Sequence, residues 1–177
     1  MIEVATPNQM DEVRNLFREY AASLSVDLCF QNFAQELAGL PGTYDPILVS
    51  GVTGFGLSGC IALRPLTGGV AEMKRLYVRP QHRGKGIGSQ LVEAIIQAAV
   101  DRHYQAIRLD TLPEMQPAIA LYRRMGFQEI AQYCDNPVPG ALYLELKLPS
   151  PGRILGSEAS SSSPQTIRPC AHGTRRS

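Results

Sequence analysis

Residues 76–88 read LYVRPQHRGKGIG, and this stretch decides how the whole chain is interpreted. An apolar strand ends at Val78, a loop with three glycines in five residues follows, and an amphipathic helix begins. Glycines let backbone amides converge on an anion, and the N-terminus of the next helix adds the positive end of its dipole. The order of strand, glycine-rich loop and helix therefore predicts an anion-binding site.

Positive charge gathers around the same loop. Residues 64–85 hold six basic side chains and one acid, Glu72. The basic residues are Arg64, Lys74, Arg75, Arg79, Arg83 and Lys85. Such a concentration of positive charge indicates a ligand that carries phosphate groups.

The spacing of the loop excludes two common phosphate-binding motifs. The dinucleotide fingerprint GxGxxG fails because its third glycine is missing after Gly88. The P-loop fails because Gly84-Lys85 leads into Gly86, where that motif needs serine or threonine. What remains is the pattern Arg83-x-x-Gly86-x-Gly88.

A second motif follows at residues 118–127, which read AIALYRRMGF and predict a helix that is stopped by Gly126. With both motifs in this order, the chain resembles the GNAT superfamily of acetyl-CoA-dependent N-acetyltransferases. Residues 83–88 match the family's pyrophosphate loop, [QR]-x-x-G-x-[GA], and residues 118–127 resemble its A-x-x-LY-x-x-x-GF helix. The resemblance covers nearly all of residues 1–148 and is strongest to small stand-alone bacterial members.

Apolar periodicity and turn residues predict an α/β fold with helices packed on a mixed sheet. The expected strands cover residues 2–4, 47–50, 57–63, 71–78, 107–111 and 142–148, with one more short strand before the last. The first expected helix follows a capping box at Thr6. Three more expected helices cover residues 31–40, 89–100 and 117–125. Alternation along the strand 71–78 places Glu72, Lys74, Leu76 and Val78 on one face. The resemblance adds a mostly antiparallel sheet with a splay between its fourth and fifth strands.

The resemblance further implies that acetyl-CoA enters this splay as co-substrate. Its pantetheine arm would pair with the backbone of residues 76–78, and its pyrophosphate with the amides of residues 83–88. The implied binding residues are Leu76, Tyr77, Val78, Arg83, Gly84, Lys85, Gly86, Ile87 and Gly88. Met115 departs from the family, because many members carry there an asparagine that contacts pantetheine.

Two residues are predicted to be catalytic. Tyr122 fits an ordinary core position, but the resemblance implies that it protonates the departing thiolate of CoA. Glu72 lies eleven residues before Arg83, the spacing of the catalytic glutamate in histone-acetylating members of the family. It is interpreted either as the general base or as the partner of Lys74 or Arg75 in a structural ion pair. The amide of Val78 would stabilise the oxyanion.

The predicted reaction is direct acetyl transfer, in a ternary complex, to the primary amine of a small-molecule or amino-acid-like acceptor. Two alternatives stay open. One is a non-catalytic acyl-CoA-binding or sensing module, which Met115 favours and the presence of both Glu72 and Tyr122 disfavours. The other is a protein lysine or N-terminal acetyltransferase, which needs an open peptide groove.

Composition limits the partners and the compartment. The 177 residues are 44% hydrophobic and carry a formal net charge of +1, which excludes a strongly basic nucleic-acid binder. Neither a membrane span nor a secretory signal is visible, so we predict a cytoplasmic protein without nucleic-acid or membrane partners, as a monomer or homodimer. The four cysteines form no CxxC pair, so no metal is expected.

The C-terminal part has a different composition from the rest. Residues 149–177 are rich in Ser, Pro and Gly, and hold four arginines and one acid, a net charge of +3. A segment with so few large apolar residues cannot offset its ordering entropy by burial. We therefore predict an N-acetyltransferase domain at residues 1–148 and a disordered tail at residues 149–177.

Overall fold

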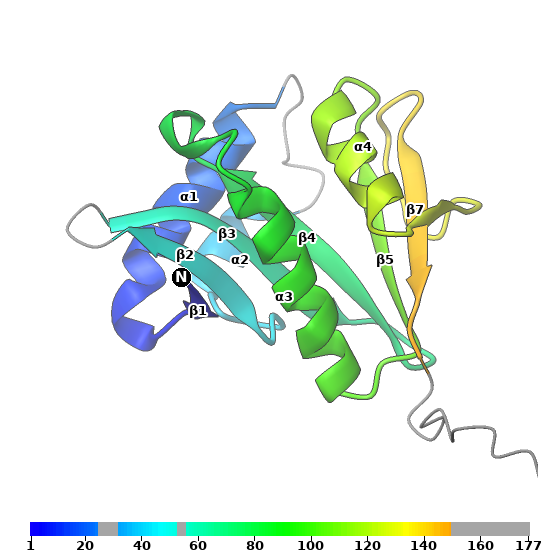
Figure 1. Cartoon of the computed structure of the whole chain (residues 1–177), viewed down its shortest axis with the longest axis horizontal. Helices are drawn as coiled ribbons and strands as arrows, with labels where there is room; N and C mark the ends of the chain where they lie inside the picture. The colour runs from blue at the N-terminus through cyan, green and yellow to red at the C-terminus, as the bar shows by residue number, and fades with distance from the viewer. Residues whose placement is uncertain (25–31, 53–55, 150–177) are drawn as a thin grey trace, which may run out of the picture.

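The computed structural model describes residues 1–24, 32–52 and 56–149. They contain a seven-stranded sheet in the order β1-β2-β3-β4-β5-β7-β6 (Figure 1). Its strands are β1 (Ile2–Val4), β2 (Ile47–Val52), β3 (Gly56–Pro65), β4 (Val70–Val78), β5 (Ala106–Thr111), β6 (Gln128–Glu129) and β7 (Leu142–Lys147). Only β4 and β5 pair in parallel among these strands, so the predicted mixed, mostly antiparallel sheet is confirmed. The predicted tail lies outside the described residues, apart from Pro149.

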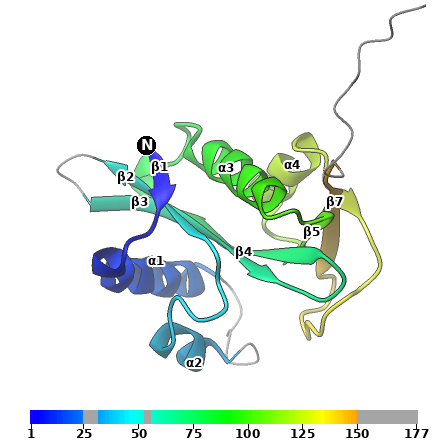
Figure 2. The ribbon, with the colours of Figure 1, turned by 90° about the horizontal axis from the view of Figure 1, so that it is seen from below.

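Helices cover both faces of this sheet. Figure 2 shows α3 and α4 on one face, and α1 and α2 on the other. The helical segments are η1 (Pro7–Gln9), α1 (Met10–Ala22), α2 (Phe33–Ala38), η3 (Pro80–His82), α3 (Ile87–Asp101) and α4 (Gln116–Arg124). The helix α2 is shorter than the expected residues 31–40, because Asn32 adopts a left-handed conformation and Gly39 caps the other end. Gln31 lies outside the described residues.

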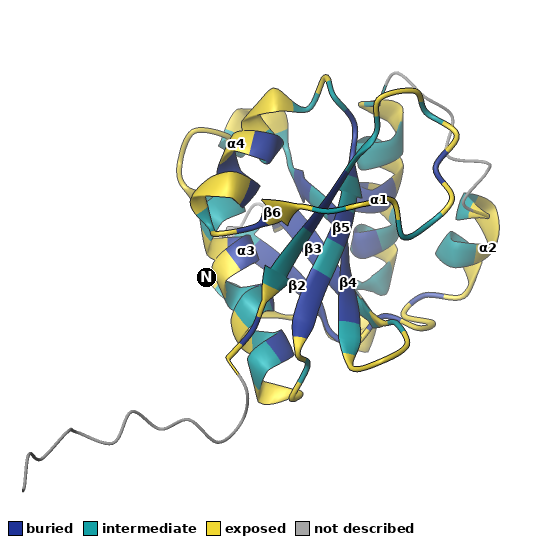
Figure 3. Ribbon diagram, turned by 90° about the vertical axis from the view of Figure 1, so that its right-hand side faces the viewer, coloured by how far each residue is buried: buried dark blue, intermediate teal, exposed yellow. Residues whose placement is uncertain are grey.

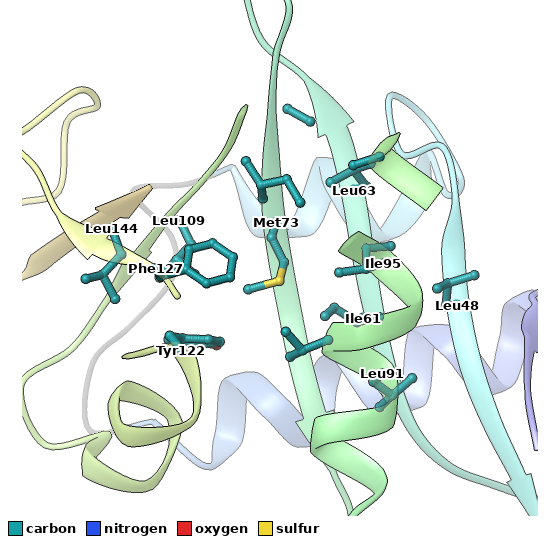
Figure 4. Packing of buried hydrophobic residues seen from close by; sticks show 14 of the residues in the cluster. Leu48, Ile61, Leu63, Met73, Leu91, Ile95, Leu109, Tyr122, Phe127 and Leu144 are labelled. Carbon is teal, nitrogen blue, oxygen red and sulfur yellow. The ribbon is translucent and has the colours of Figure 1, made fainter. Parts of the chain in front are cut away.

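Two apolar layers hold the helices to the sheet, and buried positions concentrate in the central strands (Figure 3). On the α3 side, Leu91 and Ile95 pack against Ile61, Leu63 and Met73 (Figure 4). The layer on the α1 side includes Val13, Leu16, Phe17, Val49, Cys60 and Tyr77. Because both faces are covered, the sheet is a rigid platform on which the loops at its edges are positioned.

The strands β4 and β5 separate along their length. Their pairing joins Val70–Glu72 to Ala106–Arg108 and stops there, although the strands continue to Val78 and Thr111. Figure 1 shows the two strands meeting at one end and diverging towards the end that carries α4. The predicted splay between the fourth and fifth strands is therefore confirmed. Backbone groups of β4 beyond the paired segment face the opening on this side.

β4 also contains a bulge. Lys74 pairs with Ala62 of β3, and Tyr77 pairs with Cys60. Two residues of β4 between these pairs therefore face the single residue Ile61 of β3. A bulge of this kind inserts one extra residue and reverses the alternation of the strand beyond it.

The bulge overturns one expectation about β4. Leu76 and Val78 pack against the apolar layer on the α3 side. Glu72 and Lys74 instead line a hollow on the opposite side, together with Glu36 of α2. The prediction that these four side chains share one face is wrong, because strict alternation holds only for a strand without an inserted residue.

Candidate active site

A cleft of about 620 Å³ opens where β4 and β5 diverge. It runs from the β4 backbone, along the glycine-rich loop, to α4. All of the predicted cofactor-binding residues line it except Lys85, which lies in the same loop. Sequence reasoning missed the further contributions of Tyr20, Ser23, Leu24, Ser89, Glu114, Pro117, Ala118, Leu121 and Arg124. Tyr20 belongs to α1, and Pro117, Ala118, Leu121 and Arg124 belong to α4. Only the tertiary structure brings these two helices close to the loop.

The glycine-rich loop has the geometry of an anion cradle. Gly84 and Gly86 have φ values of +75° and +77°, in the left-handed region that glycine adopts without strain. Gly86 is also the N-cap of the fifteen-residue helix α3 and provides no side-chain cap for its first-turn amides. These amides, the helix dipole and the guanidinium groups of Arg83 and Arg124 suit a pyrophosphate. The residues present therefore fit CoA.

Arg83 lies along the edge of β4. Its Nε donates a hydrogen bond to the Val78 carbonyl at 2.9 Å. Its guanidinium carbon is 5.8 Å from the ring centroid of Tyr77. The structure thus brings a predicted phosphate-side arginine to the strand segment expected to pair with pantetheine.

An inner pocket continues the cleft between the diverging strands, and Tyr122 lines it. The Tyr122 ring is 6% exposed and packs against Phe127, with 5.8 Å between ring centroids (Figure 4). Its hydroxyl has no hydrogen-bond partner among the described residues. Burial raises the pKa of this phenol, so it is protonated at neutral pH and able to donate a proton. Met115 lines the same pocket, and its sulfur accepts a hydrogen bond from the Thr111 hydroxyl at 3.8 Å.

A third cavity, here called the acceptor hollow, has a volume of about 160 Å³ and lies on the α2 side of the sheet. Its lining consists of Glu36, Tyr44, Arg64, Glu72, Lys74, Arg75, Asp110, Cys134 and Asp135. Lys74, Arg75 and Asp110 also line the inner pocket. The cleft, the inner pocket and the acceptor hollow therefore form one series of cavities across the splay.

Glu72 lies at the base of the acceptor hollow with its side chain 1% exposed. Arg64 pairs with one of its carboxylate oxygens, and the Tyr133 hydroxyl donates to the other at 2.8 Å. The Lys74 ammonium is 3.6 Å from the same carboxylate. The structure thus shows a Glu72 ion pair with Arg64 and Lys74, while Arg75 points to a different carboxylate. Whether Glu72 also accepts a proton stays a prediction.

Sequence reasoning missed a second buried carboxylate in this network. Asp110 accepts hydrogen bonds from Lys74 at 2.7 Å and from Asn136 at 2.8 Å. Burial disfavours the charged form of Asp110, but the Lys74 ammonium and the hydrogen bonds from Lys74, Asn136 and the backbone together outweigh it and lower the pKa of this carboxyl. Asp110, Glu72 and Cys134 place possible ligand atoms within 4.8 Å of one another, and the two carboxylates are already paired with the cations of Lys74 and Arg64.

Comparison with known proteins agrees with this geometry. The sequence model of the Acetyltransferase (GNAT) family matches residues 10–127. The chain belongs to the GNAT family. No helix among the described residues of this GNAT protein is long and apolar enough to cross a membrane.

Curated relatives of this GNAT protein are named N-acetyltransferases. An uncharacterized N-acetyltransferase of Schizosaccharomyces pombe is 39% identical over 150 residues, which cover 82% of this chain and 92% of that protein. An uncharacterized N-acetyltransferase of Dictyostelium discoideum is 28% identical, and the match covers 79% of this chain and 95% of that protein. These relatives support an acetyltransferase and leave the acceptor undetermined.

Solved structures of GNAT-like proteins share the fold. A candidate acyl-CoA N-acyltransferase from Klebsiella pneumoniae is 28% identical, with a TM-score of 0.68 over 84% of this chain and 97% of that one. A candidate acetyltransferase from Salmonella typhimurium, solved with its cofactor acetyl-CoA, gives a TM-score of 0.65 at 20% identity. Its match covers 94% of this chain and 98% of the other, and it shows likeness of fold alone.

Proposed function

We propose that this GNAT protein transfers the acetyl group of acetyl-CoA directly to the primary amine of a small-molecule or amino-acid-like acceptor. The observation that carries the proposal is the series of cavities across the splay. The cleft of about 620 Å³ along the glycine-rich loop, from here on called the cofactor cleft, lies at one end. The acceptor hollow lies at the other end, and Tyr122 lines the pocket between them. Two substrates that enter from opposite sides would meet in the inner pocket, as direct transfer requires.

The chain's residues have separate tasks in this proposal. The amides of residues 83–88, with Arg83 and Lys85, hold the pyrophosphate, and the backbone of Leu76–Val78 holds the pantetheine arm. When bound, acetyl-CoA supplies the activated acetyl thioester. The Val78 amide would stabilise the charge that develops on the acyl oxygen. Tyr122 would donate its proton to the departing thiolate, since a buried phenol stays protonated at neutral pH.

The amine must lose a proton before it attacks, because an alkylammonium has a pKa of about 10. Glu72 is the proposed acceptor of that proton, directly or through a water. Its hydrogen bonds from Arg64 and Tyr133 hold the carboxylate in one orientation at the base of the acceptor hollow. The charged lining of the hollow favours a polar amine, and its volume of about 160 Å³ suits a small molecule better than a peptide chain.

The test is an acceptor screen that measures the release of free thiol from acetyl-CoA. Amino acids, polyamines, aminoglycosides and peptides serve as acceptors, and reactions without acceptor give the background hydrolysis. We expect thiol release with at least one small amine and a matching acetylated product by mass spectrometry. Binding of acetyl-CoA with no release for any amine would favour the sensing module, and release with peptides alone would favour a protein acetyltransferase.

A further inference from the structure

The bulge of β4 contains an unusual backbone conformation. Arg75 has a φ of +60°, in the left-handed region where a non-glycine residue is uncommon. Asn32 and His103 share this feature, but Asn and His are among the residue types that adopt it most readily, and His103 also directly follows the C-cap of α3, where it is ordinary. Arg75 instead lies inside a strand, in a bulge position that normally selects glycine. A residue held in such a conformation calls for a feature elsewhere that fixes it.

The feature that fixes Arg75 is its side chain, which is 3% exposed. Its guanidinium makes a two-pronged ion pair with Glu36 of α2, including an Nε to Oε1 distance of 2.8 Å. The guanidinium carbon also lies 5.2 Å from the Phe33 ring centroid and 5.8 Å from that of Tyr20. Glu36 accepts a further hydrogen bond from the Tyr44 hydroxyl at 2.9 Å. Glycine at this position would satisfy the backbone but would lose all of these contacts.

This ion pair joins the two halves of the site. Arg75 directly precedes Leu76–Val78, the segment proposed to hold the pantetheine arm. Glu36 and Tyr44, at the other end of the pair, line the acceptor hollow. Tyr20, which contacts the guanidinium, lines the cofactor cleft and the inner pocket. A movement of α2 would therefore disturb the geometry of this buried ion pair, which begins at the bulge, and such a loss is costly.

We propose that Arg75 is a positioning residue that couples α2, the wall of the acceptor hollow, to the cofactor-binding segment of β4. The ion pair with Glu36 holds the bulge in the conformation that presents Leu76–Val78 to acetyl-CoA. Binding of acetyl-CoA along that segment in turn restrains α2, so the acceptor hollow is ordered before the amine arrives. This inference rests on the proposed function, since it assumes that acetyl-CoA binds along β4.

The coupling is measured by amide hydrogen exchange of residues 33–38, with and without saturating acetyl-CoA, which needs no known acceptor. In the wild-type protein we expect acetyl-CoA to slow this exchange by about threefold or more. In Arg75→Gly, which suits the positive φ but removes the ion pair, the slowing should disappear. Glu36→Gln keeps Arg75 and the shape of α2, and in this variant the slowing of exchange by acetyl-CoA should also disappear. The second variant also decides the question if Arg75→Gly does not fold.

A matched control separates coupling from simple anchoring of α2. Arg14 of α1 donates a hydrogen bond from its Nε to the Leu37 carbonyl at 3.0 Å, so Arg14→Gln weakens an anchor of α2 without touching β4. This variant should keep the response to acetyl-CoA. Titration calorimetry with acetyl-CoA accompanies each measurement. Binding to the wild-type protein without a response in α2, or an unchanged response in both test variants, would overturn the inference alone. Absence of binding would overturn the proposed function with it.

Discussion

Tyr122 offers the most direct test of the proposed chemistry at the level of one residue. Tyr122→Phe removes only a hydroxyl that has no hydrogen-bond partner among the described residues. The packing of this ring against Phe127 should therefore be preserved, and the shape of the cofactor cleft should not change. We expect turnover to fall by roughly ten- to a thousandfold, the usual contribution of acid–base assistance.

Steady-state thiol release measures this loss once an acceptor has been identified. CoA affinity by calorimetry and the melting temperature are the controls, and both should stay close to the wild-type values. Full activity in Tyr122→Phe would assign the residue to the core. A large loss of stability would mean that its hydroxyl serves the fold.

Asp110 permits a prediction about pH. Its pKa is lowered in the folded protein, so its ion pair with Lys74 stabilises the fold fully above the ordinary carboxyl pKa of about 4. This contribution is lost as the pH falls through the lower folded pKa. Asp110→Asn should cost about 2 kcal/mol at pH 7, less than the 3–5 kcal/mol typical of breaking a buried pair, because Glu72 remains near Lys74.

Urea denaturation of the wild-type protein and of Asp110→Asn, at pH 7 and at pH 3, tests this direction of the pH dependence. The difference in the free energy of unfolding should shrink at pH 3, because the Asp110 carboxyl of the unfolded chain, with its ordinary pKa of about 4, then binds a proton that the folded protein resists. An equal difference at both values would show that Asp110 stabilises the fold by packing and not by its charge.

At the level of elements, the loop between β4 and α3 carries the cofactor prediction. Gly86→Val places a β-branched residue at a φ of +77°, which should displace the amides at the start of α3. We expect CoA affinity to fall by about tenfold or more, because the anion cradle depends on the position of those amides. Calorimetric titration with CoA gives the measurement.

Gly68→Val is the matched control for this loop. Gly68 has a φ of +69° in the turn between β3 and β4, and an added Cβ there meets no atom within 4 Å. The two variants carry a similar backbone penalty, but only Gly86 lines the cofactor cleft. Unchanged CoA affinity in Gly86→Val, or an equal loss in Gly68→Val, would contradict the assignment of the loop.

For the whole molecule, the predicted tail sets the extent of the domain. Residues 149–177 are rich in Ser, Pro and Gly, and few of them are large and apolar. A protein truncated after Ser150 should therefore keep its melting temperature within about 2 °C and bind CoA as the full chain does. Thermal denaturation of the two chains decides the matter. A decrease of several degrees would show that residues 151–177 pack on the domain.

Local signals in the sequence were sufficient for the fold and for the conformation of the glycine-rich loop. Strand, glycine-rich loop and helix are continuous at residues 76–88, so the geometry of the anion site follows from neighbours along the chain. The helix with Tyr122 was found for the same reason, because its apolar face repeats at helical spacing and Gly126 ends it. The short α2 was predicted too long, since its start depends on the conformation of Asn32.

The acceptor side was decided by tertiary structure. The β4 bulge leaves no mark in the sequence, because Arg75 occupies a position where glycine is the expected signal. The partners of its ion pair, Arg75 and Glu36, are 39 residues apart, and Lys74 and Asp110 are separated by 36. The amino-acid sequence by itself therefore determined the family, the sheet and the position of the glycine-rich loop, whose contacts are local. Only the folded chain decided which charges pair around the acceptor hollow, because ion pairs between distant segments depend on strand register and helix placement.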